Sequence, residues 1–65
     1  MRIIVNGEPR DLSDGTTLHA LLALLKLTPD KVAIELNRRL IRGEKYDTPL
    51  KEGDAVEIVT FVGGG

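Results

Sequence analysis

The end of the chain decides the fold, and from Ala55 to Gly65 it reads AVEIVTFVGGG. The apolar, β-branched run from Ala55 to Val62 predicts a strand, and a strand with so few polar positions suits the centre of a sheet. Three glycines follow, which offer only backbone groups and the terminal carboxylate and can enter spaces that no Cβ would fit. The stretch therefore predicts a central strand that leads into a flexible glycine tail, residues 62–65. Taken alone, the glycines would equally fit an incidental end of the chain.

The composition limits what else the chain can be. Its 65 residues predict one small domain, 1–65, with an aliphatic core. There is no cysteine and His19 is the single histidine, so we expect no disulfide and no metal site. Nine basic and ten acidic residues leave a net charge of −1, which argues against nucleic-acid binding. No run approaches the ~20 apolar residues of a membrane span, and no signal peptide is visible, so we expect a cytoplasmic chain without membrane association.

The start of the chain predicts a β-hairpin. Met1 to Val5 is apolar and β-branched, and Asn6-Gly7 follows it directly. Asn-Gly between two extended runs is a strong hairpin signal, because both turn residues need a positive φ. The return strand is expected at Glu8 to Leu12, and its proline marks it as an edge strand.

A helix is expected next, from Leu18 to about Leu27, with Thr17 as its N-cap. Its leucines form one broad stripe for the core: Leu18, Leu21, Leu22, Leu24 and Leu25. His19 lies on the opposite side of this helix. Because no nucleophile or carboxylate is placed beside it by sequence spacing, we interpret it as a solvated surface residue.

The middle of the chain predicts a second pair of strands, Val32 to Asn37 and Leu40 to Arg42. An irregular crossover, Gly43 to Leu50, should follow, with Tyr46 and Leu50 reaching the core. The basic residues around the second hairpin, Arg38, Arg39, Arg42 and Lys45, could bind a phosphate or an acidic partner, but a solvated hairpin tip is the favoured interpretation.

This order of elements predicts an α+β chain of the β-grasp (ubiquitin-like) class. The expected structure is a mixed five-stranded sheet with one main helix packed on one face, and its first and last strands are parallel neighbours. The opposite face would carry Ile4, Val59 and Phe61, directly upstream of the tail. With Val62, these residues form the predicted docking patch, because a cluster of exposed apolar side chains beside a protruding end suggests a partner surface.

Four stretches resemble the ThiS family of sulfur carriers from bacterial thiamin biosynthesis. They are Ile3–Gly7 (IIVNG), Asp14–Leu18 (DGTTL), Ala33–Asn37 (AIELN) and Gly53–Gly65, and the length matches throughout. A Gly-Gly ending is common to ubiquitin-like proteins, but its combination with this length and a Gly-Asp turn is more specific.

The resemblance implies a carrier that is not itself an enzyme and holds no cofactor. An E1-like adenylyltransferase of the ThiF type would consume ATP to adenylate Gly65. The adenylate would become a thiocarboxylate, with sulfur from a donor such as a cysteine desulfurase. A thiazole synthase of the ThiG type would then take the sulfur, with Gly63 and Gly64 threading the tail into each active site.

Three alternatives remain open at this point. The chain could be the related carrier of molybdopterin synthesis, although those proteins are usually longer. It could be a ubiquitin-like modifier that is joined to proteins or serves tRNA thiolation. It could also be a plain β-grasp interaction domain. An enzyme is the weakest interpretation, because no paired carboxylates, nucleophile–base set or phosphate loop stands out.

Overall fold

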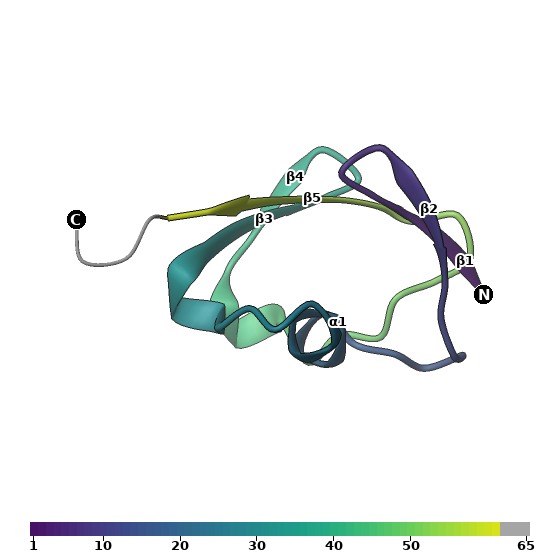
Figure 1. Ribbon diagram of the computed structural model, residues 1–65, viewed down its shortest axis with the longest axis horizontal. Helices are drawn as coiled ribbons and strands as arrows, with labels where there is room; N and C mark the ends of the chain where they lie inside the picture. The colour runs from purple at the N-terminus through teal and green to yellow at the C-terminus, as the bar shows by residue number, and fades with distance from the viewer. Residues whose placement is uncertain (62–65) are drawn as a thin grey trace.

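The computed structural model describes residues 1–61, which form a five-stranded sheet with one α-helix on one side (Figure 1). In chain order the elements are β1 (Arg2–Val5), β2 (Glu8–Asp11), α1 (Leu18–Leu24), the 3₁₀ turn η1 (Pro29–Lys31), β3 (Val32–Leu36), β4 (Arg39–Ile41), the 3₁₀ turn η2 (Gly43–Lys45) and β5 (Ala55–Thr60). The strand order is β2-β1-β5-β3-β4. The predicted α+β, β-grasp architecture is confirmed.

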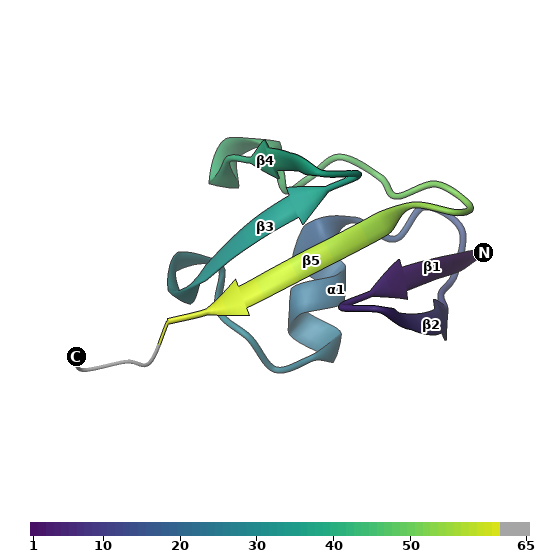
Figure 2. The same cartoon turned by 90° about the horizontal axis from the view of Figure 1, so that it is seen from above.

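The predicted central strand is also confirmed. β5 pairs in parallel with β1, with Val56 opposite Val5, and antiparallel with β3, with Ile58 opposite Ile34. Figure 2 shows that β1 ends part-way along β5, whereas β3 runs beside most of it. β5 ends at Thr60 rather than at Val62, which lies outside the described residues.

The first hairpin has the predicted turn. Asn6 and Gly7 have φ values of 49° and 83°, the pattern of a two-residue type I′ turn that matches the twist of the strands. β2 carries Pro9 and lies at the edge of the sheet, where its side chains are exposed.

The helix begins as predicted but ends earlier. The Thr17 hydroxyl accepts a hydrogen bond from the Ala20 N–H (3.1 Å), which caps the first turn. The expected continuation to Leu27 is wrong, because the chain closes in a Schellman motif. The Leu27 N–H donates to the Leu22 carbonyl (2.9 Å), and Lys26 adopts a left-handed φ of 61°.

One member of the predicted leucine stripe is misplaced. Leu18, Leu21 and Leu22 are buried, but Leu24 is 64% exposed. At 100° per residue Leu24 lies at the margin of the stripe, and the sheet covers only its centre. The expectation that Leu24 joins the core is therefore wrong.

The core lies between α1 and the sheet. Its buried side chains are Ile3, Val5, Leu18, Leu21, Leu22, Val32, Ile34, Tyr46, Leu50, Val56 and Ile58. The expected burial of Tyr46 and Leu50 from the crossover is confirmed, and the Leu50 N–H donates to the Thr16 carbonyl (2.8 Å). No buried side-chain polar atom within residues 1–61 lacks a hydrogen-bond partner.

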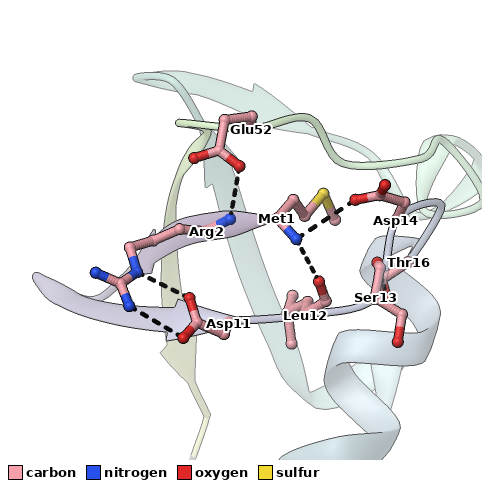
Figure 3. Close-up of polar contacts among 8 residues, drawn as sticks. All are labelled: Met1, Arg2, Asp11, Leu12, Ser13, Asp14, Thr16 and Glu52. Atoms are coloured by element: carbon pink, nitrogen blue, oxygen red, sulfur yellow. Dashed lines mark hydrogen bonds and ion pairs between the residues drawn. The ribbon is translucent and has the colours of Figure 1, made fainter.

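A polar network joins the segments around the start of β1 (Figure 3). The Met1 ammonium donates to the Leu12 carbonyl (2.7 Å), and the Arg2 N–H donates to a Glu52 carboxylate oxygen (2.8 Å). The Arg2 guanidinium contacts both oxygens of Asp11, at 2.8 and 3.0 Å. This hydrogen-bonded ion pair lowers the pKa of Asp11 and raises that of Arg2.

Candidate functional site

The candidate site is the end of β5 that leads toward the tail. The hydrogen bonds on its β3 side come from odd-numbered residues: the Phe61 N–H donates to the Lys31 carbonyl (2.8 Å), and the Ala55 carbonyl accepts from the Asn37 N–H (2.7 Å). Because backbone groups alternate along a strand, those of residues 56, 58 and 60 point toward the β1 side. Pairing with β3 therefore extends to Thr60, and the bond from Phe61 to Lys31, at the end of η1, continues it by one residue.

On the β1 side, backbone pairing stops earlier. The Asn6 N–H donates to the Val56 carbonyl (2.8 Å), and β1 itself ends at Val5. The next pair of backbone groups, on Ile58, is bound by the Asn6 side chain. Its Oδ1 accepts from the Ile58 N–H (2.7 Å), and its Nδ2 donates to the Ile58 carbonyl (3.2 Å).

The uncovered face of β5 exposes two large apolar side chains near its end. Val59 is 59% exposed and Phe61 is 55% exposed, as the strand alternation predicts. The sheet register separates Ile4 from them, because Ile4 lies opposite Ala55, four residues before Val59, or about 13 Å along the strand. The expectation of a single three-residue cluster is therefore wrong, and of these three side chains only Val59 and Phe61 lie together near the end of β5.

The same face carries features that the sequence did not reveal. Glu57 lies opposite Glu35 in the β3–β5 pair, and Glu35 lies opposite Leu40, which is 65% exposed. Alternation within each strand gives a residue's face, but the neighbours across strands depend on the register. The two carboxylates and Leu40 could be placed together only once that register was known.

His19 has a neighbour that sequence spacing did not predict. Its Nδ1 lies 2.7 Å from an Asp47 carboxylate oxygen, and its ring meets the edge of Tyr46 with centroids 5.7 Å apart. The contact joins α1 to the segment after η2, 28 residues away. Both residues are exposed, and within residues 1–61 no group of three or more metal-binding side chains occurs.

The basic cluster lies on the second hairpin and after it, as expected. All four side chains, from Arg38, Arg39, Arg42 and Lys45, are exposed.

In the part of the chain that the structure describes, no helix is long and apolar enough to cross a membrane.

Comparison with known proteins identifies the family. The model of the ThiS family matches residues 3–65, which is nearly the whole sequence. The chain belongs to the ThiS family. A sulfur carrier protein ThiS of Thermus thermophilus is 42% identical over 94% of this ThiS-family chain and 95% of its own length. The crystal structure of a thiamine biosynthesis protein (ThiS) from Geobacter metallireducens covers 100% of both chains at 36% identity, with a TM-score of 0.82.

A second kind of relative is much longer. A thiazole synthase of Magnetococcus marinus is 46% identical to this ThiS-family chain over 66 residues. The alignment covers 100% of the chain but only 20% of that protein. A ThiS-like segment therefore occurs within a longer protein that bears the name thiazole synthase.

The glycine tail itself lies outside the described residues. Val62, Gly63, Gly64 and Gly65 are all inside the matched family region, but no contact of theirs is described. The roles expected of Gly65 as the modified residue and of Gly63 and Gly64 in threading remain predictions. The described structure brings the chain to Phe61, whose N–H is bonded to the Lys31 carbonyl at the end of η1.

Proposed function

We propose that the chain is the sulfur carrier of thiamin biosynthesis and carries sulfur as a thiocarboxylate on Gly65. A ThiF-type enzyme adenylates the Gly65 carboxylate with ATP, and a donor such as a cysteine desulfurase supplies the sulfur. The loaded carrier then gives its sulfur to a ThiG-type thiazole synthase. The chain is a protein co-substrate rather than a catalyst, and its ATP-dependent loading places it in the cytoplasm.

The supporting observation is the continuity between the family match and the fold. The ThiS family region extends to residue 65 and includes the central strand β5, which pairs with β3 up to Thr60 and is followed by Phe61, bonded to Lys31. The strand and this bond hold the chain as far as Phe61, two residues before the first glycine in the sequence. A tail without side chains is the part of the protein that can enter a narrow active site.

The chemistry explains why activation is needed. A terminal carboxylate has a pKa near ~3.5, so it is ionised at neutral pH and is a poor electrophile. Attack of a carboxylate oxygen on the α-phosphorus of ATP forms an acyl adenylate and releases pyrophosphate. A sulfide-equivalent nucleophile can then attack the carbonyl carbon, and AMP leaves with the bonding electrons. Groups of the partner enzymes stabilise the developing charge.

Docking is assigned to the face of β5 next to the tail. Val59 and Phe61 are exposed there, and Val62 continues the sequence toward the glycines. Burial of large apolar side chains is the usual source of affinity at the centre of an interface. Ile4, which lies beside Ala55, would contribute at the margin of this docking surface.

The thiazole synthase partner has its own support. The Magnetococcus marinus protein named thiazole synthase contains a segment similar to the whole chain. Joining a carrier and its acceptor in one polypeptide would raise their effective concentration, so the pairing is physically reasonable. The activating enzyme and the sulfur donor follow from the family resemblance alone.

Exchange of labelled pyrophosphate into ATP tests the first step. With a ThiF-type enzyme, the full chain should stimulate exchange, whereas a chain lacking Gly65, or one extended by a single alanine, should not. The two altered chains should unfold at the same temperature as the original. Stimulation by either altered chain would contradict the assignment of Gly65 and would favour a plain docking domain.

A further inference from the structure

Two asparagines occupy equivalent places in the two hairpins of the sheet. Asn6 has a φ of 49° and Asn37 a φ of 52°, and each starts a turn whose second residue also has a positive φ. Each directs its side-chain amide to β5, but at different ends of that strand. The pair therefore offers a matched comparison of what such an amide does.

Asn6 bonds to the half of β5 that leads to the tail. Its amide binds the Ile58 N–H and carbonyl at 2.7 and 3.2 Å, as a neighbouring strand would. β1 has already ended there (Figure 2). Ile58 is thus held from β3 on one side by strand pairing and from the other side by one side chain.

Asn37 bonds to the opposite end of β5. Its Oδ1 accepts from the Ala55 N–H (2.9 Å), and its Nδ2 donates to an Asp54 carboxylate oxygen (3.0 Å). These bonds are on the β3 side of β5, and on the other side Ala55 lies opposite Ile4 of β1, so this end of β5 has a neighbouring strand there. The two contacted residues, Ala55 and Ile58, are about 10 Å apart along the strand.

The turn alone does not require asparagine at position 6. Glycine adopts a positive φ at least as easily, and Gly-Gly is also a common type I′ sequence. Within residues 1–61, no bond other than the two to Ile58 is found for the Asn6 amide. Compared with glycine, asparagine therefore adds two hydrogen bonds to the backbone of Ile58.

We propose that Asn6 is a positioning residue, which holds the tail-side end of β5 so that the chain docks on its activating enzyme in one orientation. This inference rests on the proposed sulfur-carrier function. Without the Asn6 amide, Ile58 to Phe61 would be held along one side only. The partner would then have to order Val59 and Phe61 on binding, and this cost would appear as a weaker apparent affinity.

The test compares Asn6→Gly with Asn37→Gly in full-length chains. Both substitutions keep a turn-compatible residue and remove one amide from β5, so both should lower the unfolding temperature by a few degrees. In pyrophosphate exchange, Asn6→Gly should raise the KM for the carrier about tenfold with kcat within about twofold. Asn37→Gly should change the KM by less than about twofold.

Two further readouts keep the test independent of folding losses. Exchange of the Ile58 amide hydrogen with solvent should be faster in Asn6→Gly than in Asn37→Gly at equal distance below each unfolding temperature. Asn6→Asp retains an acceptor for the Ile58 N–H but loses the donor to its carbonyl, so its KM should be intermediate.

The outcomes separate the two claims. If the original chain supports exchange but both glycine variants show the same KM, or the Ile58 amide stays protected in Asn6→Gly, the positioning role is wrong and the carrier function stands. If the original chain supports no exchange with an enzyme that is active on another ThiS carrier, the proposed function fails and this inference fails with it.

Discussion

The two ends of β5 are built differently. At the Ala55 end the strand lies between β1 and β3, and the preceding turn is tied to both neighbours. The Gly53 N–H donates to the Arg2 carbonyl (2.8 Å), and Asp54 accepts from the Lys51 N–H (2.8 Å) and from Asn37 (3.0 Å). The start of β5 is therefore bonded to the chain on both of its sides.

The Thr60 end has fewer neighbours and more exposed surface. β3 pairs with it on one side, and on the other side the Asn6 amide reaches only as far as Ile58. Its outer face presents Val59 and Phe61 to solvent. One end of the strand is thus bonded into the domain, and the other leaves apolar side chains exposed, which is where we propose that partners dock.

The largest effect is expected in the tail beyond this accessible end. Gly64→Leu should reduce thiocarboxylate formation about a hundredfold or more, because a side chain there would displace the reacting carboxyl group in a narrow active site. The unfolding temperature should not change, since the core lies elsewhere. Single-turnover loading with a ThiF-type enzyme measures the first quantity and calorimetry the second. Normal loading of this variant would show that the tail does not thread.

Substitutions on the inner and outer faces of the tail-side end of β5 should differ in their effect on the free energy of unfolding. Ile58 is buried and Val59 is exposed, so Ile58→Ala should lower the free energy of unfolding by about 2–4 kcal/mol and Val59→Ala by less than about 1 kcal/mol. Urea titration followed by circular dichroism measures both. Equal losses would mean that the outer face is packed in solution, contrary to the account.

Docking should depend on the outer face near the tail. Phe61→Ala should weaken binding to the activating enzyme about tenfold, because a large apolar side chain is lost from the contact. Leu24→Ala is the matched control, since Leu24 is similarly exposed but lies on α1, on the other side of the sheet. Titration calorimetry with the purified enzyme compares them, and equal weakening by both would reject β5 as the docking surface.

A smaller effect is expected where the two glutamates face each other in the middle of the sheet. Glu57→Gln removes the repulsion with Glu35 and should raise the free energy of unfolding by about 0.2–1 kcal/mol at low salt. The gain should shrink as salt is added, because the pair is exposed. Thermal unfolding at two salt concentrations checks this, and a loss of stability would mean that Glu57 has a favourable partner.

The smallest effect is expected at the Arg2–Asp11 pair, near the Ala55 end of β5. The Arg2 guanidinium lowers the pKa of Asp11, so the pair stabilises the fold above the ordinary carboxyl value of 3.8, and this contribution is lost as pH falls through the lower folded value. The unfolding temperature of Asp11→Asn should therefore be slightly lower than that of the original chain at pH 6. Under strongly acidic conditions the two unfolding temperatures should be equal. A difference that persisted or grew in acid would contradict this sign.

Much of the fold could be predicted because local signals agreed. Asn6-Gly7 specified the first turn, Thr17 capped the helix, and the apolar run after Ala55 marked the central strand. The end of the helix was missed because it depends on Lys26 in a left-handed conformation, which glycine usually supplies. The exposure of Leu24 was missed because a helical stripe does not show how much of it the sheet covers.

The candidate site was predictable only in part, for a similar reason. Alternation along β5 correctly predicted that Val59 and Phe61 are exposed. Whether Ile4 lies near them depends on the register between β1 and β5, which the sequence does not give. The contacts of the Asn6 amide with Ile58, and of His19 with Asp47, join residues 52 and 28 positions apart. Local patterns in a single sequence carry no signal for such pairs.

The central claim is that the protein carries sulfur on Gly65, and intact-mass analysis tests it most directly. The full chain is incubated with ATP, a ThiF-type activating enzyme and a sulfur donor, beside a chain that lacks Gly65. The account predicts that one oxygen of the full chain is replaced by sulfur, that fragmentation places it on Gly65, and that the shortened chain keeps its mass. An unchanged mass of the full chain, with an enzyme that loads another ThiS carrier under the same conditions, would contradict it.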